Sequence, residues 1–398
     1  MRIVFVSNYI NHHQIPLCSA LSKAADTDFT FVQTEPMDEE RRRMGWADEI
    51  GSLPYVRSLQ DDPDGIKKLL LSCDILLAGW APAAEETVRG RLLAGRPVLR
   101  ISERLYRDGR WKAISPRGLA DKYMAFTRFR TAPCYLLCSG AYVGSDFALI
   151  HAFPHKKLRW GYFPPLRTYK DGELQQIKER AEAEAGCVRL LWAGRFMDVK
   201  HPEMALRLAK ELHERKVPFH LDMIGSGEKE AEYRSFAAEN GLSESVVFHG
   251  FLDPAQVRTF MERARIFLFT SDHGEGWGAV LNEAMNSGCA VTAGAQAGGV
   301  PYLIKSGANG YIYNGEDFSD FSAKVLHLIE NKDLAQAMGA RAYEEIAGLW
   351  NAQTAAERLL AFCRKIMGGE NPMEGLPAEG PLSPDPELRP FLRAKRLP

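Results

Sequence analysis

The chain has 398 residues, of which 45% are hydrophobic and 25% are charged, and its 50 lysines and arginines nearly balance its 51 aspartates and glutamates. This composition is typical of a globular protein with more than one core, and the near-zero net charge gives no indication of a nucleic-acid partner. No apolar run is long enough to cross a bilayer, and the chain opens on a strand rather than a signal peptide. Together with 7 scattered cysteines, this favours a reducing, cytoplasmic location.

Strands alternate with helical or irregular connections in the first half of the chain. Short apolar runs predict strands at residues 2–7, 29–32, 74–78, 97–101 and 134–137. This alternation predicts a Rossmann-like β/α/β domain with a parallel sheet. The loop after the first strand opens at the carboxyl edge of the sheet, where ligands bind. We therefore predict acceptor contacts from this loop, although a helix cap and solvent-facing imidazoles explain the same residues nearly as well: Asn11, His12, His13 and Gln14.

Residues 101–130 are rich in positive charge and aromatic rings. The stretch holds eight basic residues, including Arg107, Arg110 and Lys112, against three acidic ones, and five aromatic residues are interleaved with them. A surface of this kind can rest on anionic lipid or hold an acidic acceptor. It would then bring the protein to the inner face of the membrane as a peripheral protein. A solvated helix face above core aromatics is the alternative interpretation.

A second alternating half follows Phe163-Pro-Pro165 and a charged run at 170–184, which together are expected to form the interdomain connection. Its strands are predicted at 188–193, 219–224, 245–250, 265–270 and 290–293. Two cations, Arg195 and Lys200, bracket the loop after the first of these strands. Cations at the carboxyl end of a strand can hold a diphosphate leaving group.

The run from Ser271 to Gly288 joins a buried strand to a glycine-rich turn and then a helix. Glycines before a helix start let a ligand approach unpaired N–H groups, a setting that favours phosphate. Since carboxylates repel phosphate, Glu275 and Glu283 should bind neutral hydroxyls, one on a sugar and one on a ribose. The helix should pack an apolar face on the sheet and present Glu283, Asn286 and Ser287 on a polar face. A turn residue and a solvated helix residue are the alternative interpretation of the two carboxylates.

Several short motifs occur together in order between residues 188 and 315. They are Gly194-Arg195 with Lys200, Gly225-Ser226-Gly227, His249-Gly250, Glu275 with Glu283 in an E-x7-E arrangement, Gly288, and Gly298-Gly-Val-Pro301. In this order and spacing they resemble the group 1 (family 4) retaining glycosyltransferases of the GT-B fold. The amino-terminal half matches that family only in layout. The resemblance implies an α/β protein with two Rossmann-like β/α/β domains facing a central cleft.

The resemblance also implies roles for individual residues. Arg195 and Lys200 would bind the donor diphosphate, Glu275 would contact the transferred sugar, and Glu283 would hold the ribose; the first three would be the catalytic set. Further donor contacts would come from Gly225, Gly250, Gly276, Trp277, Gly278 and Ala279. Many relatives carry a histidine near the transferred sugar where this chain reads Ile101-Ser-Glu-Arg104. Whether Glu103, His12 or His13 takes that role stays open, and Glu103 joins the acceptor candidates.

The implied enzyme transfers a sugar from a nucleotide diphosphate sugar, with UDP favoured, keeps the donor's α configuration and requires neither metal nor cofactor. Its acceptor would be sugar-containing or lipid-linked. We expect an acceptor domain at 1–165, a donor domain at 166–350, a crossing helix at 351–369 and a Pro/Gly-rich tail at 370–398 that drapes over the surface or is disordered. The competing functions are a noncatalytic glycosyltransferase-like subunit and a nucleotide-sugar epimerase on the same fold.

Overall fold

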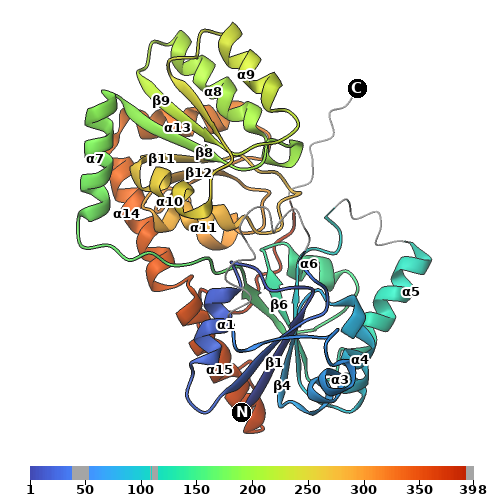
Figure 1. The fold of residues 1–398 in the computed structure, drawn as a ribbon. Helices are drawn as coiled ribbons and strands as arrows, with labels where there is room; N and C mark the ends of the chain where they lie inside the picture. The colour runs from blue at the N-terminus through green and yellow to red at the C-terminus, as the bar shows by residue number, and fades with distance from the viewer. Residues whose placement is uncertain (38–52, 108, 110–114, 391–398) are drawn as a thin grey trace. The chain divides into compact units, whose positions relative to one another are not determined.

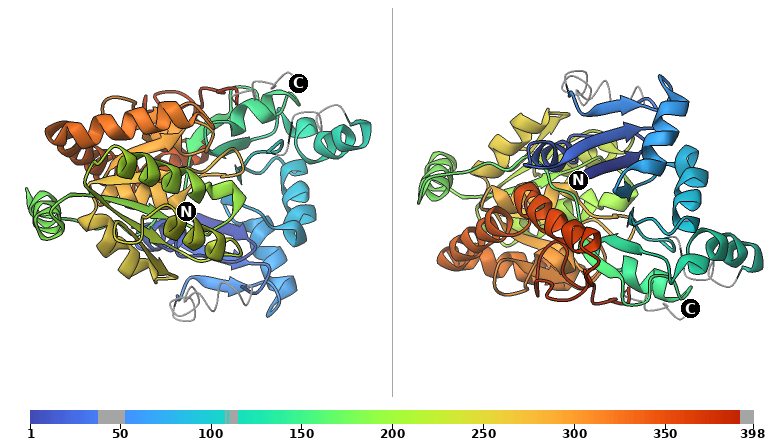
Figure 2. Two further views of the ribbon diagram at one scale, coloured as in Figure 1. Left: turned by 90° about the horizontal axis from the view of Figure 1, so that it is seen from above. Right: turned by 90° about the horizontal axis from the view of Figure 1, so that it is seen from below.

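The structure is a computed structural model, and it describes residues 1–37, 53–107, 109 and 115–390. These residues form two compact units. The first unit consists of Met1–Pro165 with Trp350–Arg389, and the second is built from Leu166–Leu349. Each unit has its own sheet with helices on both faces (Figures 1 and 2).

The sheet of the first unit has seven strands in the order β3-β2-β1-β4-β5-β6-β7, and every pair of neighbours is parallel. Strands β4 and β6 are buried along their whole length, as expected for a parallel sheet that helices cover on both faces. The strands are β1 (Arg2–Ser7), β2 (Asp28–Gln33), β3 (Val56–Ser58), β4 (Ile75–Ala78), β5 (Val98–Ser102), β6 (Cys134–Ser139) and β7 (Lys157–Trp160).

Helices connect the strands of the first unit, and one further helix, α15, comes from the carboxyl-terminal part of the chain. They are α1 (Ile15–Ser22), α3 (Pro63–Ser72), η2 (Pro82–Ala84), α4 (Glu85–Leu93), α5 (Pro116–Ala125), η4 (Thr127–Phe129), α6 (Val143–Ala148) and α15 (Ala352–Met367). Helix α15 packs against α1, and the ribbon views show the two helices side by side (Figures 1 and 2).

The segment after α15 is held against the edge strand β7. Leu382 and Ser383 are buried, and both form backbone hydrogen bonds with Arg159, at 2.9 Å and 2.8 Å. Lys157 on the same strand pairs with Glu387 at 2.8 Å. The described part of the tail therefore covers a sheet edge that would otherwise expose unpaired backbone groups.

The sheet of the second unit has six parallel strands in the order β10-β9-β8-β11-β12-β13. The strands are β8 (Val188–Ala193), β9 (Phe219–Ile224), β10 (Val246–Gly250), β11 (Ile266–Phe269), β12 (Ala290–Gly294) and β13 (Tyr311–Tyr313). The helices are α7 (Glu173–Ala185), η5 (Asp198–Lys200), α8 (Pro202–Glu214), α9 (Glu230–Glu239), α10 (Pro254–Arg263), α11 (Ala279–Asn286), α12 (Val300–Leu303), α13 (Phe318–Glu330) and α14 (Lys332–Gly348).

The structure corrects the expected role of the charged run at 170–184. This run is not a linker, because most of it forms α7, which packs on β8 and α10 within the second unit. Two of its charged residues are buried and paired: Lys178 donates to the carbonyl of Ala264 at 2.6 Å, and Glu182 accepts two bonds of 2.9 Å from Arg265. These charged side chains can be buried because they are paired with residues from distant parts of the sequence. The stretch therefore forms part of the core although its sequence is polar.

Candidate functional site

The order of the strands reverses between β8 and β11 in the second unit. In open parallel sheets, ligands bind outside the carboxyl ends of the strands at such a reversal. The two segments that leave the sheet at this point are the loop after Ala193, which holds Arg195 and Lys200, and the turn after Phe269, which holds Glu275. The predicted diphosphate and sugar contacts therefore start from adjacent strands.

The two cations of the loop after β8 differ in their exposure and in their partners. Lys200 ends the short helix η5 and forms an ion pair with Glu275, and both side chains are largely buried, with exposed fractions of 20% and 16%. Arg195 is exposed, and its guanidinium has no hydrogen bond or ion pair among the described residues. The structure thus brings Lys200 and Glu275 together and leaves Arg195 available to an anion.

Two glycines hold the neighbouring turns against this loop. Gly225 has φ +134°, and a Cβ atom there would lie 1.8 Å from the carbonyl oxygen of Gly194. Its N–H donates to the carbonyl of Gly250 at 2.8 Å. The predicted donor residue Gly225 therefore lies next to Gly194, which precedes Arg195, and Gly250 lies next to Gly225. Close backbone approach explains the glycine at 225.

The turn after β11 leads directly into α11. Gly278 has φ +89°, and a Cβ atom there would lie 2.5 Å from the ring of Phe269, so only glycine fits. Trp277 is buried, and its indole N–H donates to Asn282 at 2.8 Å. The buried indole of Trp277 thus holds the turn in place. Helix α11 begins at Ala279. Gly276 is buried between Glu275 and Trp277.

Helix α11 presents Glu283 but not the polar face predicted for it. Asn286 and Ser287 are buried, and Asn286 accepts hydrogen bonds from the backbone N–H of Arg167 at 2.9 Å and from Arg258 at 2.5 Å. The expectation that these two residues face a ligand is wrong, because the segment at Arg167 and helix α10 cover them. Glu283 stays partly exposed, and burial raises the pKa of its carboxyl to about 7 against the opposing charges of Arg258 and Arg167.

His201 links the loop after β8 to the turn after β11, although no motif in the sequence indicated it. Its Nδ1 lies 2.6 Å from Glu203, and its Nε2 lies 3.2 Å from Asp272 in the turn after β11. Hydrogen bonds to Asp272 and then Glu203 raise the pKa of His201 to about 10. The residue also has φ +47°, a conformation uncommon outside glycine, asparagine and aspartate. Its position directly after Lys200 was the only signal in the sequence.

The predicted acceptor residues lie at the carboxyl edge of the other sheet. Asn11 and Gln14 close the turn after β1: Asn11 accepts from the N–H of His13 at 3.1 Å, and Gln14 accepts from the N–H of Asn11 at 3.2 Å. The rings of His12 and His13 are in contact, with centroids 3.6 Å apart and planes inclined at 50°. Glu103 follows β5 and accepts a hydrogen bond of 2.6 Å from the hydroxyl of Tyr162.

Tyr162 connects two of these acceptor candidates, His13 and Glu103, although no sequence motif indicated it. Its ring stacks on that of His13, with centroids 6.1 Å apart. The loop after β1, the residue after β5 and the segment after β7 therefore meet around one tyrosine in the first unit. Asn11 and Gln14 form a turn and not the expected side-chain helix cap, because the N-cap residue of α1, Gln14, makes no side-chain cap hydrogen bond. The acceptor role of these residues stays a prediction, and the side chains of His13 and Glu103 both contact Tyr162.

Comparison with known proteins places the second unit in a family. Residues 175–345 match the family model described as glycosyl transferases group 1. The second unit is a group 1 glycosyltransferase domain. The chain is 27% identical over 226 residues to D-inositol 3-phosphate glycosyltransferase of Nocardia farcinica, covering 54% of this chain and 49% of that protein. It is 23% identical over 185 residues to the putative colanic acid biosynthesis glycosyltransferase WcaL of Salmonella typhimurium, covering 45% of each. The chain thus spans about half the length of the curated relatives it matches.

Solved structures resemble the whole chain in fold. Anabaena HepE in complex with UDP superposes with a TM-score of 0.69 at 14% identity and covers 92% of this chain and 100% of its own. Sucrose-phosphate synthase from Thermosynechococcus elongatus superposes with a TM-score of 0.64 at 17% identity, covering 93% and 100%. At these identities the likeness concerns the fold alone. The GT-B fold with two Rossmann-like domains, predicted from the motifs of the glycosyltransferase domain, is confirmed.

The basic stretch at 101–130 is only partly described, since Asp108, Arg110, Trp111 and Lys112 lie outside the described residues. Two of its aromatic residues, Tyr106 and Phe129, are buried, as the core interpretation predicts. Helix α5 differs, because none of its residues is buried and it exposes apolar side chains together with basic ones. These exposed residues are Arg117, Leu119, Tyr123 and Met124.

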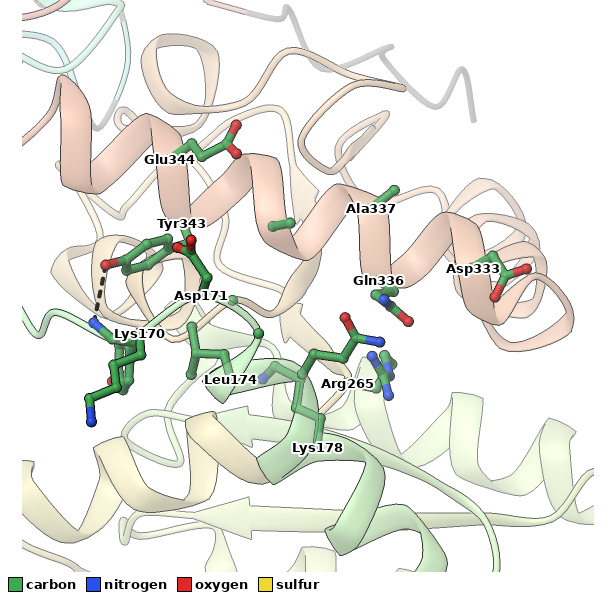
Figure 3. Close-up of a pocket in the computed structure, with 15 residues that line it drawn as sticks. Lys170, Asp171, Leu174, Lys178, Arg265, Asp333, Gln336, Ala337, Tyr343 and Glu344 are labelled. Carbon is green, nitrogen blue, oxygen red and sulfur yellow. Dashed lines mark hydrogen bonds between the residues drawn. The ribbon is translucent and has the colours of Figure 1, made fainter.

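A cavity of 480 Å³ lies at the opposite edge of the glycosyltransferase domain, near the amino ends of β11 and β12 (Figure 3). Lys170 and Asp171 from the start of α7 face Tyr343 and Glu344 on α14 across it. Its buried cation Lys178 is already satisfied by backbone carbonyls, at 2.6 to 3.2 Å. This cavity holds none of the predicted donor residues.

Within the described part of the chain, no group of three or more His, Cys, Asp or Glu side chains is arranged to hold a metal ion. Within the same residues, no helix is long and apolar enough to span a bilayer. The expected independence from metal stays a prediction.

Proposed function

We propose that this protein is a retaining glycosyltransferase of the EC 2.4 class that moves a sugar from a nucleotide diphosphate sugar, with UDP favoured, to an acceptor hydroxyl. The observation that carries the proposal is the ion pair between Lys200 and Glu275 at the strand reversal between β8 and β11, on the loop that also holds the exposed Arg195. Solved structures of Anabaena HepE, which has the same fold, hold UDP and UDP-glucose. These complexes support a nucleotide sugar as the donor.

The charges of the site match the needs of a diphosphate leaving group. Negative charge accumulates on the diphosphate as the bond to the sugar breaks, and fixed cations stabilise it most in that state. Arg195 has no ion-pair partner within the described part of the chain, and Lys200 can exchange Glu275 for phosphate oxygens, so both can supply this charge without a divalent ion. Glu275, released from Lys200, would then accept hydrogen bonds from hydroxyls of the transferred sugar.

Glu283 would bind the ribose hydroxyls of the donor. It lies eight residues after Glu275, about one turn into α11, and no side-chain hydrogen bond occupies its carboxyl among the described residues. A pKa of about 7 means that this carboxyl is partly protonated at neutral pH. It can therefore either accept from or donate to a vicinal diol.

The first unit would bind the acceptor, which is sugar-containing or lipid-linked. The residues at its carboxyl edge offer a carboxylate and stacked rings, and helix α5 adds exposed cations and apolar side chains. We propose a role in polysaccharide, glycolipid or other glycoconjugate biosynthesis in the cytoplasm, with peripheral contact at the inner face of an anionic membrane and without a nucleic-acid partner. Basic residues beside exposed apolar ones are the pattern that such membranes attract.

Separate measurements of binding and turnover test the donor site. Calorimetric titration with UDP should show that Arg195→Ala, Lys200→Ala and Glu283→Ala each lose about 1.5–3 kcal/mol of affinity, the usual value of a charge-assisted hydrogen bond. Glu275→Gln should keep UDP affinity and lose turnover instead, since it acts on the sugar. The matched control is Arg215→Ala, an exposed cation at the end of α8.

The outcome also decides between functions. Unchanged UDP affinity in the Arg195 and Lys200 variants would refute the assigned donor site. UDP binding without release of sugar from any nucleotide sugar would indicate a noncatalytic subunit. A product of inverted anomeric configuration, seen by proton NMR, would contradict retention.

A further inference from the structure

Trp80 is exposed to an unusual degree in this protein. It follows β4 after one residue, Gly79, and has an exposed fraction of 74%. The other tryptophans that the structure describes, Trp160, Trp192, Trp277 and Trp350, have exposed fractions of 2% or less. Because burial of an aromatic side chain is strongly favourable, an indole left in water at a ligand-binding edge indicates a surface that a ligand covers.

The backbone on both sides of Trp80 is fixed. The N–H of Gly79 donates to the carbonyl of Val6 at 2.9 Å, which extends the pairing of β4 with β1. After Trp80, Ala81 and Ala84 are buried, and Glu85 makes two hydrogen bonds to Arg100 on β5, of 2.8 and 2.9 Å. The indole therefore projects from a rigid turn. Because the turn is already fixed, ligand binding there would cost little conformational entropy.

The position of Trp80 in the sheet places it among the acceptor candidates. The strand order of the first unit reverses between β1 and β4, so Trp80 leaves the sheet at its reversal point. Strand β4 lies between β1, which leads to His13, and β5, which leads to Glu103. An apolar indole face beside a carboxylate matches the two surfaces of a sugar ring, its C–H face and its hydroxyl edge.

The charges at this edge favour a neutral sugar. Each arginine that β5 and the following residues place here is paired with a carboxylate: Arg100 with Glu85, Arg104 with Asp146 at 3.2 Å, and Arg107 with Glu103 at 3.8 Å. Among the described residues of this segment, no arginine is left over to bind a phosphate. A phosphorylated sugar would have to break one of these pairs.

We propose that Trp80 is the stacking platform for a neutral terminal sugar of the acceptor, and that it selects acceptors by that sugar's C–H face. This inference rests on the proposed transferase function, because it assigns the acceptor class of the same enzyme. A lipid-linked acceptor remains compatible, since helix α5 can contact the membrane while the terminal sugar stacks on the indole.

The test compares Trp80→Ala and Trp80→Phe with Leu93→Ala in the full-length protein. Leu93 is the matched control, because it is an exposed apolar residue, 68% exposed, at the opposite end of α4. Saccharide binding is followed by saturation-transfer NMR with a panel of neutral and phosphorylated monosaccharides and oligosaccharides at millimolar concentration. The indole N–H signal of Trp80 is assigned by its loss in Trp80→Phe. UDP affinity and donor hydrolysis without acceptor are measured in parallel.

We expect neutral saccharides to shift the Trp80 signal, and Trp80→Ala to weaken their binding and raise the acceptor KM by about 10- to 100-fold, with Trp80→Phe retaining most binding. UDP affinity and donor hydrolysis should be unchanged in all three variants. Equal saccharide binding by wild type and Trp80→Ala, binding of phosphorylated sugars alone, or no saccharide binding at all would overturn the proposal. So would a Trp80 signal that responds only to lipid vesicles. If the wild type does not hydrolyse any donor, the transferase function is refuted instead. The saccharide titration would still test Trp80 in that case.

Discussion

Replacing His201 with asparagine should remove a pH-dependent connection between the two loops of the donor site. Asparagine tolerates the positive φ of this position but cannot carry the charge that pairs with Asp272 and Glu203. In the wild type the charged imidazole contacts a carboxylate on each side, with distances of 2.6 and 3.2 Å. Burial opposes ionisation of Asp272, but the hydrogen bond from His201 leaves the pKa of that carboxyl lowered.

The size and sign of the effect follow from the pKa of His201, which rises from 6.5 to about 10 on folding. Each pH unit corresponds to 1.36 kcal/mol, so the difference amounts to about 5 kcal/mol at most. The cluster is partly exposed, with 23% of the imidazole accessible, and we expect solvent to reduce this to about 2–3 kcal/mol. Because the folded pKa is raised, the stabilisation is fully present below pH 6.5 and is lost as the pH rises through about 10.

The assay is urea unfolding of wild type, His201→Asn and the control His213→Asn at several pH values between 6 and 10, with proton NMR of the imidazole as a direct titration. His213 is an exposed histidine near the end of α8. Wild type and the control should lose the additional 2–3 kcal/mol across this range, and His201→Asn should not. Parallel pH profiles for His201→Asn and wild type would show that this cluster does not hold the loops together.

Three further predictions address the backbone, the metal and the membrane. Gly225→Ala should destabilise the second unit by at least about 3 kcal/mol in thermal unfolding, because its Cβ would meet a carbonyl oxygen, whereas Gly307→Ala, also at positive φ but in open space, should cost about 1–2 kcal/mol. EDTA should leave turnover intact, since Arg195 and Lys200 supply the charge; recovery that strictly requires Mg²⁺ or Mn²⁺ would contradict this. Arg107→Glu, Arg117→Glu and Arg128→Glu together should weaken sedimentation with anionic vesicles, more so at low salt than at high salt; absence of vesicle binding by the wild type would refute membrane contact.

The sequence was sufficient for features that depend on local pattern. Every strand predicted from an apolar run is present within a residue or two, because buried parallel strands carry a continuous apolar signal. In the first sheet, the two strands that were missed, β3 and β7, lie at its edges. Strand β3 has three residues, and β7 alternates lysine and arginine with apolar residues, so neither shows that signal.

The features that could not be predicted depend on contacts between distant segments. His201 and Asp272 are 71 positions apart, and Asn286 is covered by a residue 119 positions away. Tyr162 meets Glu103 across 59 positions. No periodicity or motif encodes such pairs, so helix geometry alone suggested that Asn286 faces a ligand. The same limit explains α7, whose buried charges have their partners on other elements.

The distribution of unpaired charge supports placing the donor at the carboxyl edge rather than in the cavity of the second unit. At the amino edge, the charged groups of Lys178 and Arg265 already have partners: Lys178 donates to backbone carbonyls, and Arg265 donates to Glu182. At the carboxyl edge, Arg195 has no partner among the described residues and Lys200 has one that a diphosphate can replace. An anion gains most where a cation is not already neutralised, as at Arg195, and where the one pair to be broken can be replaced by the anion itself, as at Lys200. The cavity at the amino edge is therefore the poorer site for a nucleotide diphosphate.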